Sequence, residues 1–133
     1  MGIGKVTSKS ERSPLAVTGD LTVTERLSAA STANTHSPAA NTAAVITKNA
    51  VAGQSHHITG VAWSYDDDPT GGNLNITDGG ASVFQIDITK GGPGFIPFDA
   101  PVEFATNSQV IVTLAAGGAG VSGIVNLLGF WTE

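Results

Sequence analysis

Residues 82–89 read SVFQIDIT and give the clearest indication of the fold in this chain. Phe84, Ile86 and Ile88 fall on one side of an extended segment, and the alternate positions are mostly polar. Because successive side chains of a β-strand point to opposite faces, this period of two predicts a strand with one buried face.

Shorter segments of the same kind follow one another from residue 43 onward, separated by connectors rich in Gly, Pro, Asn and Asp. They are residues 43–49, 57–65, 73–77, 101–104, 109–115 and 123–131. Turns are expected at DDDPTGG (66–72), DGG (78–80) and GGPG (91–94). No window of eleven or more residues has a helical period, so the strands must cover one another as two sheets. The sequence predicts an all-β protein, an antiparallel β-sandwich of seven strands.

The last predicted strand, residues 123–131, is apolar on both faces. Ile124, Leu128 and Phe130 are assigned to one face, and Val125, Leu127 and Trp131 to the other. Either one face contacts a partner, or the strand is central and covered by loops. The pattern alone leaves both explanations open.

The composition points to a surface with few charges. The chain of 133 residues has room for one domain, and 13% of its residues are charged, against about 25% in typical soluble proteins. A neutral surface suits a protein packed against others, although an ordinary β-domain can share it. The net charge of −5 gives no general attraction to nucleic acid, so none is expected as a partner.

The N-terminal third differs from the rest of the chain. Leu15, Val17, Leu21 and Val23 alternate with other residues around a Gly-Asp pair, which predicts two short strands in need of a pairing partner. Residues 27–44 are small, polar and free of aromatics, and on their own should be mobile. We therefore divide the chain into an extended arm with a flexible linker (1–42) and a sandwich domain (43–133).

Cysteine is absent, which excludes disulfides and thiolate metal sites. The N-terminus lacks the apolar run of a signal peptide, and no segment approaches the ~20 apolar residues of a membrane helix. Synthesis in a cytoplasm and no membrane partner are expected.

No catalytic, cofactor-binding or metal-binding residue is predicted. The sequence GAGVSG (118–123) fits a dinucleotide-binding pattern, but a strand-like segment follows it where a helix is required, so AAGGAG is interpreted as a hairpin loop. His56 and His57 are adjacent on a strand and should point to opposite faces, and His36 lies in the linker. Without a nucleophile motif or a placed carboxylate pair, the protein is expected not to be an enzyme.

An acidic turn is the one candidate for a cation site in this sequence. Asp66, Asp68, Thr70 and Gly71 match the first positions of a calcium loop, but the twelfth position is Thr77, where a bidentate Glu belongs. A solvated acidic turn is the preferred interpretation, and weak calcium binding by Asp66 and Asp68 stays open.

Three blocks in the same order resemble small virion proteins of tailed bacteriophages. They are ITGVAWSYDDDPTGGNLNITDGG (58–80), VFQIDITKGGPGFIPFDAPVEF (83–104) and VIVTLAAGGAGVSGIVNLLGFW (110–131). The resemblance implies a capsid decoration, or cement, protein: a jelly-roll-like sandwich on the outer capsid surface of the virion, made in the host cytoplasm. It implies the major capsid protein and neighbouring copies of the chain as partners, and it carries over no site residue.

The arm supplies the candidate assembly contacts of this hypothesis. Fully extended, residues 1–42 would span roughly 150 Å and reach a neighbouring subunit, where a short strand can add to a sheet edge. The candidate contacts are Leu15, Val17, Leu21, Val23 and Leu27.

Two alternatives to capsid decoration remain. One is a fibre or adhesin module that binds host glycans through the loops at 66–73 and Trp63 or Tyr65. The other is a tail or neck structural protein.

Overall fold

The computed structural model describes residues 33–133, which contain nine strands and no helix. The strands are β1 (Thr35–His36), β2 (Ala44–Lys48), β3 (His56–Tyr65), β4 (Gly72–Asp78), β5 (Ala81–Ile88), β6 (Gly92–Glu103), β7 (Val110–Leu114), β8 (Gly123–Leu128) and β9 (Trp131–Thr132). None of this part of the chain forms a helix long and apolar enough to cross a membrane. The candidate assembly contacts Leu15, Val17, Leu21, Val23 and Leu27 lie outside the described residues.

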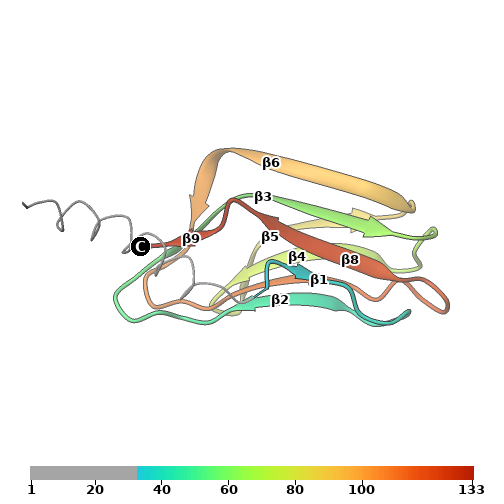
Figure 1. The fold of residues 1–133 in the computed structure, drawn as a ribbon, viewed down its shortest axis with the longest axis horizontal. Coiled ribbons are helices and arrows are strands. Elements are labelled where there is room, and N and C mark those ends of the chain that lie inside the picture. The colour runs from blue at the N-terminus through green and yellow to red at the C-terminus, as the bar shows by residue number, and fades with distance from the viewer. Residues whose placement is uncertain (1–32) are drawn as a thin grey trace, which may run out of the picture. The chain divides into compact units, whose positions relative to one another are not determined.

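The strands form two sheets that face each other, and every pairing is antiparallel (Figure 1). Sheet A has the order β1-β8-β3-β6, with β9 pairing the start of β3, and sheet B has the order β2-β7-β4-β5. In these orders β1 pairs with β8 and β3 with β6, while β2 pairs with β7 and β4 with β5. This nested arrangement is that of a jelly roll, so the predicted antiparallel β-sandwich is confirmed.

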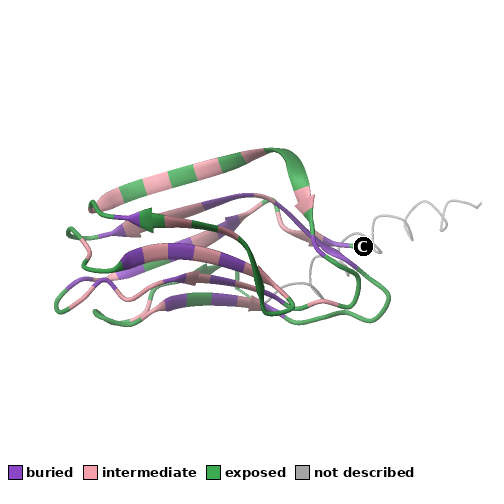
Figure 2. Ribbon diagram, turned by 180° about the vertical axis from the view of Figure 1, so that it is seen from behind, coloured by how far each residue is buried: buried purple, intermediate pink, exposed green. Residues whose placement is uncertain are grey.

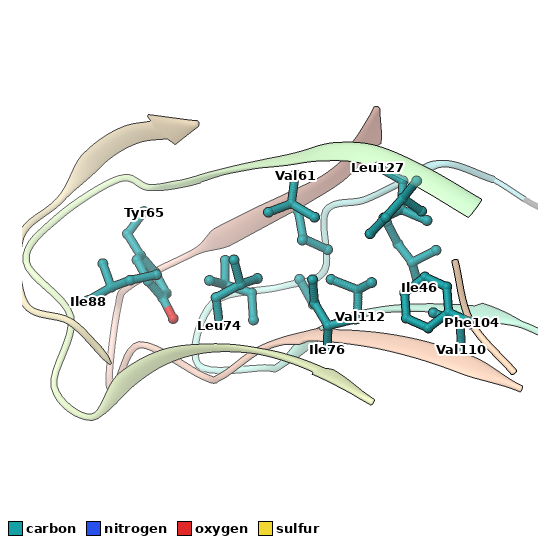
Figure 3. Packing of buried hydrophobic residues seen from close by; sticks show 14 of the residues in the cluster. Ile46, Val61, Tyr65, Leu74, Ile76, Ile88, Phe104, Val110, Val112 and Leu127 are labelled. Atoms are coloured by element: carbon teal, nitrogen blue, oxygen red, sulfur yellow. The ribbon is translucent and has the colours of Figure 1, made fainter. Parts of the chain in front are cut away.

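The core lies between the sheets (Figures 2 and 3). Its fully buried side chains come from both sheets, and the largest of them are Tyr65, Phe104, Ile58, Leu74, Ile76 and Leu114. In β5 the predicted alternation is present: Ile88 is buried and Phe84 and Ile86 pack against the core. Gln85 and Asp87 are exposed.

The turn predicted at residues 91–94 is wrong. Gly92 already belongs to β6, and the strand continues to Glu103, whereas a short strand at 101–104 was expected. The reason is tertiary: Gly94 is paired with Trp63, and a Cβ at Gly94 would overlap the Trp63 ring. Glycine is required here by a close approach within a strand, and the same residue type was interpreted as a turn marker.

The linker prediction also fails over residues 33–42. β1 pairs with β8, the Leu127 amide donates to the Asn34 carbonyl at 2.8 Å, and the Asn41 amide donates to the Val121 carbonyl at 2.8 Å. Residues 33–42 accordingly belong to the same compact unit as residues 43–133. These are main-chain hydrogen bonds, and the amino-acid composition of the segment does not indicate them.

Residues 123–132 form two strands, β8 and β9, and not the single strand predicted at 123–131. β8 and β9 are separated at Gly129, which has a φ of 59°. β8 is an inner strand between β1 and β3, with Val125 and Leu127 in the core and Ile124 on the other face, 36% exposed. Residues 115–122 connect β7 in sheet B to β8 in sheet A, so they are a crossover between sheets and not the predicted hairpin loop.

Candidate functional site

The outer face of sheet A carries a shallow groove over β3, β6 and β8. Ala62 on β3 is paired with Phe95 on β6 and with Asn126 on β8. Directly paired residues share a face of the sheet. The preceding residue, Val61, is fully buried in the core, so the Ala62 row points away from it.

This Phe95 groove has a volume of about 420 Å³. Its lining consists of Ala62, Trp63, Ser64, Pro93, Gly94, Phe95 and Asn126. No lining residue carries a charge. The groove therefore combines an apolar wall with the Ser64 hydroxyl and the Asn126 amide.

Phe95 is the most exposed large hydrophobic residue among residues 33–133, at 59%. Its ring leans toward Gly60, where an added Cβ would lie 3.5 Å from the Cε1 atom of Phe95. In the neighbouring row of paired residues, Ser64 on β3 lies between Pro93 on β6 and Ile124 on β8, so apolar residues flank the groove there. The groove thus combines an exposed aromatic ring with a lining that carries no charge.

Of the two aromatic residues named in the glycan hypothesis, Trp63 lines this groove and Tyr65 does not. Tyr65 is 1% exposed, and its hydroxyl donates to the Ala115 carbonyl at 2.6 Å. Trp63 is half-buried and packs against the core. Tyr65 is thus structural, and the exposed ring on this face belongs to Phe95.

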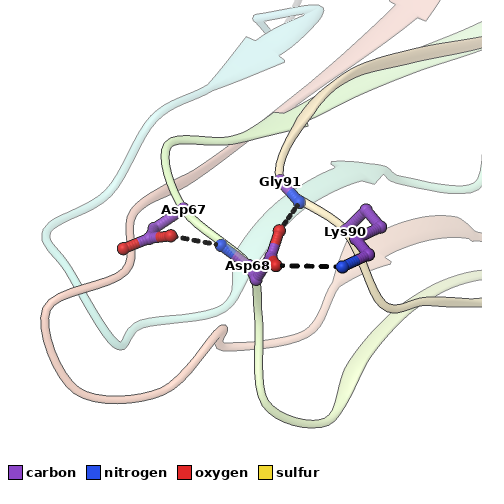
Figure 4. A network of polar contacts seen from close by, with 4 residues as sticks. All are labelled: Asp67, Asp68, Lys90 and Gly91. Carbon is purple, nitrogen blue, oxygen red and sulfur yellow. Dashed lines mark hydrogen bonds and ion pairs between the residues drawn. The ribbon is translucent and has the colours of Figure 1, made fainter.

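The acidic turn is held by hydrogen bonds to two segments, and Figure 4 shows those of Asp68 to Lys90 and Gly91. Asp66 Oδ1 accepts from the Ser122 amide at 2.8 Å. Asp68 accepts from the Gly91 amide at 2.7 Å and lies 3.4 Å from Lys90 Nζ. The Gly91 amide, followed by Lys90, lowers the pKa of Asp68. The two carboxylates join the 66–72 turn to the loops before β8 and β6, respectively.

The two adjacent histidines have different surroundings. His56 is buried, and its ring nitrogens lie 2.8 Å from Thr132 Oγ1 and 2.7 Å from the Asn49 carbonyl. His57 stacks on Trp131 with a centroid distance of 4.7 Å, and its Nε2 lies 3.8 Å from Glu103. Through Thr132 and Trp131, both rings join β9 at the C-terminal end of the chain to β3. Within residues 33–133 no three His, Cys, Asp or Glu side chains are grouped closely enough to hold a metal ion.

His36 is part of the sandwich. Its Nδ1 accepts a hydrogen bond from the Val45 amide at 2.8 Å, which connects β1 to β2. This histidine therefore helps to close the side of the sandwich where the first strands of sheets A and B meet.

Comparison with known proteins finds no matching family model and no matching curated protein. Among solved structures, a carbohydrate-binding module CBM36 in complex with calcium and xylotriose is 12% identical, with a TM-score of 0.41, covering 74% of this chain and 78% of that one. The CBM36-1 domain of a multidomain xylanase from the hindgut metagenome of Trinervitermes trinervoides is 12% identical, with a TM-score of 0.40, covering 71% and 73%.

The insecticidal delta-endotoxin Cry8Ea1 from Bacillus thuringiensis is 14% identical, with a TM-score of 0.41. The match covers 74% of this chain and 18% of the toxin.

Sequence reasoning missed the Phe95 groove for one reason. The segment GGPGF was interpreted as a turn, which removed Phe95 from any strand and from any face. The signal that could have found it is the alternation of Pro93, Phe95 and Pro97 with Gly94 and Ile96, a period of two.

Proposed function

We propose that this protein is a non-catalytic structural protein of a tailed-phage virion, which decorates the outer capsid surface and binds it through the Phe95 groove. The observation that carries the proposal is the 59% exposure of Phe95 on a face without charged lining residues. The similarity of residues 58–131 to small virion proteins supplies the class of partner, the major capsid protein.

The physical properties of the groove support a protein partner. Removing an uncharged, partly apolar face from water costs little desolvation, and a central aromatic ring is a frequent anchor of protein interfaces. Many copies on a symmetric shell would add their individual contacts, so a modest affinity per site suffices to stabilise the shell.

The test uses the full chain and capsids assembled without it. We expect the protein to bind these capsids and to raise their melting temperature, and a Phe95→Ser variant to lose both effects. Val51→Ser replaces a different exposed hydrophobic residue, in the loop between β2 and β3, and serves as the matched control. Decoration by Phe95→Ser at wild-type levels would refute the role of the groove.

One specific observation favours a second candidate, glycan binding. The Phe95 ring stands beside the Ser64 hydroxyl and the Asn126 amide, which form no hydrogen bond within residues 33–133. Aromatic rings stack on sugar faces while such groups bond sugar hydroxyls. This candidate would replace the first if the wild type binds a glycan array, the Phe95→Ser variant does not, and the wild type does not bind capsids.

A further inference from the structure

The jelly roll is open on the side where β5 and β6 form the last strands of sheets B and A. Apart from Ile88 at the end of β5, which is buried, the inward-facing residues of these strands remain half-buried: Phe84 and Ile86 on β5, and Ile96, Phe98 and Val102 on β6. In Figure 2, β6 has no buried residue along its length. At the opposite side, Ala44 and Ile46 of β2 are 1% and 3% exposed.

A small apolar cavity lies within this open side. Its volume is about 120 Å³, and Val83, Phe84, Phe98, Val102 and Phe104 are among its exclusively apolar lining residues. Phe84 and Phe98 meet edge to face across it with a centroid distance of 5.8 Å. This volume is below the ~300–1,000 Å³ of small-molecule sites, and suits an aliphatic side chain.

The two edge strands differ in how well they can accept another strand. β6 contains Pro93, Pro97 and Pro101, which lack an amide hydrogen and protect an edge against pairing. β5 contains no proline and no lysine, and from Phe84 to Ile88 its pairing with β4 is regular. Val83, beside the register shift, is 51% exposed. Strand addition is therefore favoured at β5.

The chain itself contains a segment of matching pattern. Residues 15–23 read LAVTGDLTV, with apolar residues two apart in each half. If Gly19 and Asp20 are extended, the two short strands predicted here form one strand with Leu15, Val17, Leu21 and Val23 on the same face. A strand added to β5 would place every second side chain toward the cavity and over the half-buried Phe84 and Ile86.

Connectivity argues for the source of this strand. The only charged residue of the segment 15–23 is Asp20, so its apolar pattern and its place in the chain carry the argument. β1, the first strand after this segment, lies at the opposite edge of sheet A from β6. The described chain thus begins on the side away from the cavity, which favours donation by a second copy.

We propose that the open side between β5 and β6 accepts residues 15–23 of a neighbouring copy, which add as a strand to the edge of β5 and fill the cavity with an aliphatic side chain. This self-association goes beyond the proposed function, because it is independent of what binds the Phe95 groove.

The absence of cysteine from the chain allows a test without background. One full-length variant carries Leu21→Cys and another carries Val83→Cys, and the two are mixed under mild oxidation. We expect a disulfide-linked heterodimer, and at least a tenfold lower yield when Val83→Cys is replaced by Val45→Cys, an exposed position on the opposite edge strand β2. Equal yields for the two positions would overturn the proposal.

A second measurement separates exchange between copies from other arrangements. We expect sedimentation velocity to show concentration-dependent association of the wild type, lost in the Leu21→Asp/Val23→Asp variant and retained in Phe95→Ser. A wild type that stays monomeric at all concentrations, or a Leu21→Cys/Val83→Cys double variant that links only within one chain, would overturn it. Since Phe95→Ser tests the groove separately, failure of one proposal does not imply failure of the other.

Discussion

The hydroxyl of Tyr65 donates a 2.6 Å hydrogen bond to the carbonyl of Ala115. Tyr65 ends β3 in sheet A, and Ala115 follows β7 in sheet B, so this bond connects the two sheets at one end of the core. Tyr65→Phe keeps the ring and removes the bond. We expect a loss of about 1 kcal/mol in the free energy of unfolding, measured by urea denaturation at pH 7. An unchanged midpoint would show that water replaces the hydroxyl fully.

Two buried groups predict opposite trends at alkaline pH. Burial raises the pKa of Tyr65 and lowers the pKa of Lys48. Above about pH 10, the unfolded state loses the Tyr65 proton first, so this residue makes stability fall with rising pH. Below the ordinary pKa of lysine, the folded state loses the Lys48 proton first, so that residue makes stability rise with pH.

The variants Lys48→Met and Tyr65→Phe separate these trends. Between pH 9 and 11, urea denaturation should show a steeper loss of stability in Lys48→Met than in the wild type, and a smaller loss in Tyr65→Phe. Parallel profiles for all three proteins would contradict the assigned burial effects.

The sandwich was predictable because its core strands repeat with a period of two. Val110, Val112 and Leu114 of β7 are fully buried and alternate with half-buried residues, as the sequence pattern requires. The extent of β6 was not predictable, because Gly94 is selected by the Trp63 ring on a neighbouring strand. Likewise, the pairing of β1 depends on main-chain bonds to β8, which no side-chain pattern of residues 35–36 reveals.

The candidate site was harder to predict than the fold. Trp63 and Tyr65 are the conspicuous aromatic residues of their strand, yet both contribute to the interior. Phe95 is exposed because its row in sheet A, with Ala62 and Asn126, faces away from sheet B. Such a row exists only once three strands are in register, and register between distant segments is not readable from one sequence.

Gly94→Ala tests the contact between β6 and the Trp63 ring. The added methyl would overlap the ring, so either the ring or β6 must shift. We expect a destabilisation of about 1–3 kcal/mol and a change in tryptophan emission. In the Trp63→Phe background the same substitution should cost less, and additive effects in this double-mutant cycle would contradict the contact.

Asp68→Asn tests the bond that joins the 66–72 turn to the start of β6. The lowered pKa means that Asp68 contributes stability above its ordinary pKa, and loses it as the pH falls below about 4. The variant should therefore show a weaker decline of stability on acidification than the wild type. Faster hydrogen exchange at the Gly91 amide is expected at neutral pH, and the exposed Asp99→Asn should leave that amide unchanged.

Leu74→Ala tests the centre of the core, where Leu74 on β4 is fully buried and paired with Ile86 and Leu114. Its truncation removes apolar contacts between the sheets and leaves a cavity, so we expect a loss of about 2–5 kcal/mol. Gln85→Ala on the exposed face of β5 is the control and should change stability by less than about 0.5 kcal/mol. Leu74 is fully buried within one chain, whereas Ile86 is half-buried at the open side between β5 and β6, so Ile86→Ala provides a comparison. If a neighbouring copy covers Ile86, the cost of Ile86→Ala should grow with protein concentration, whereas that of Leu74→Ala should not.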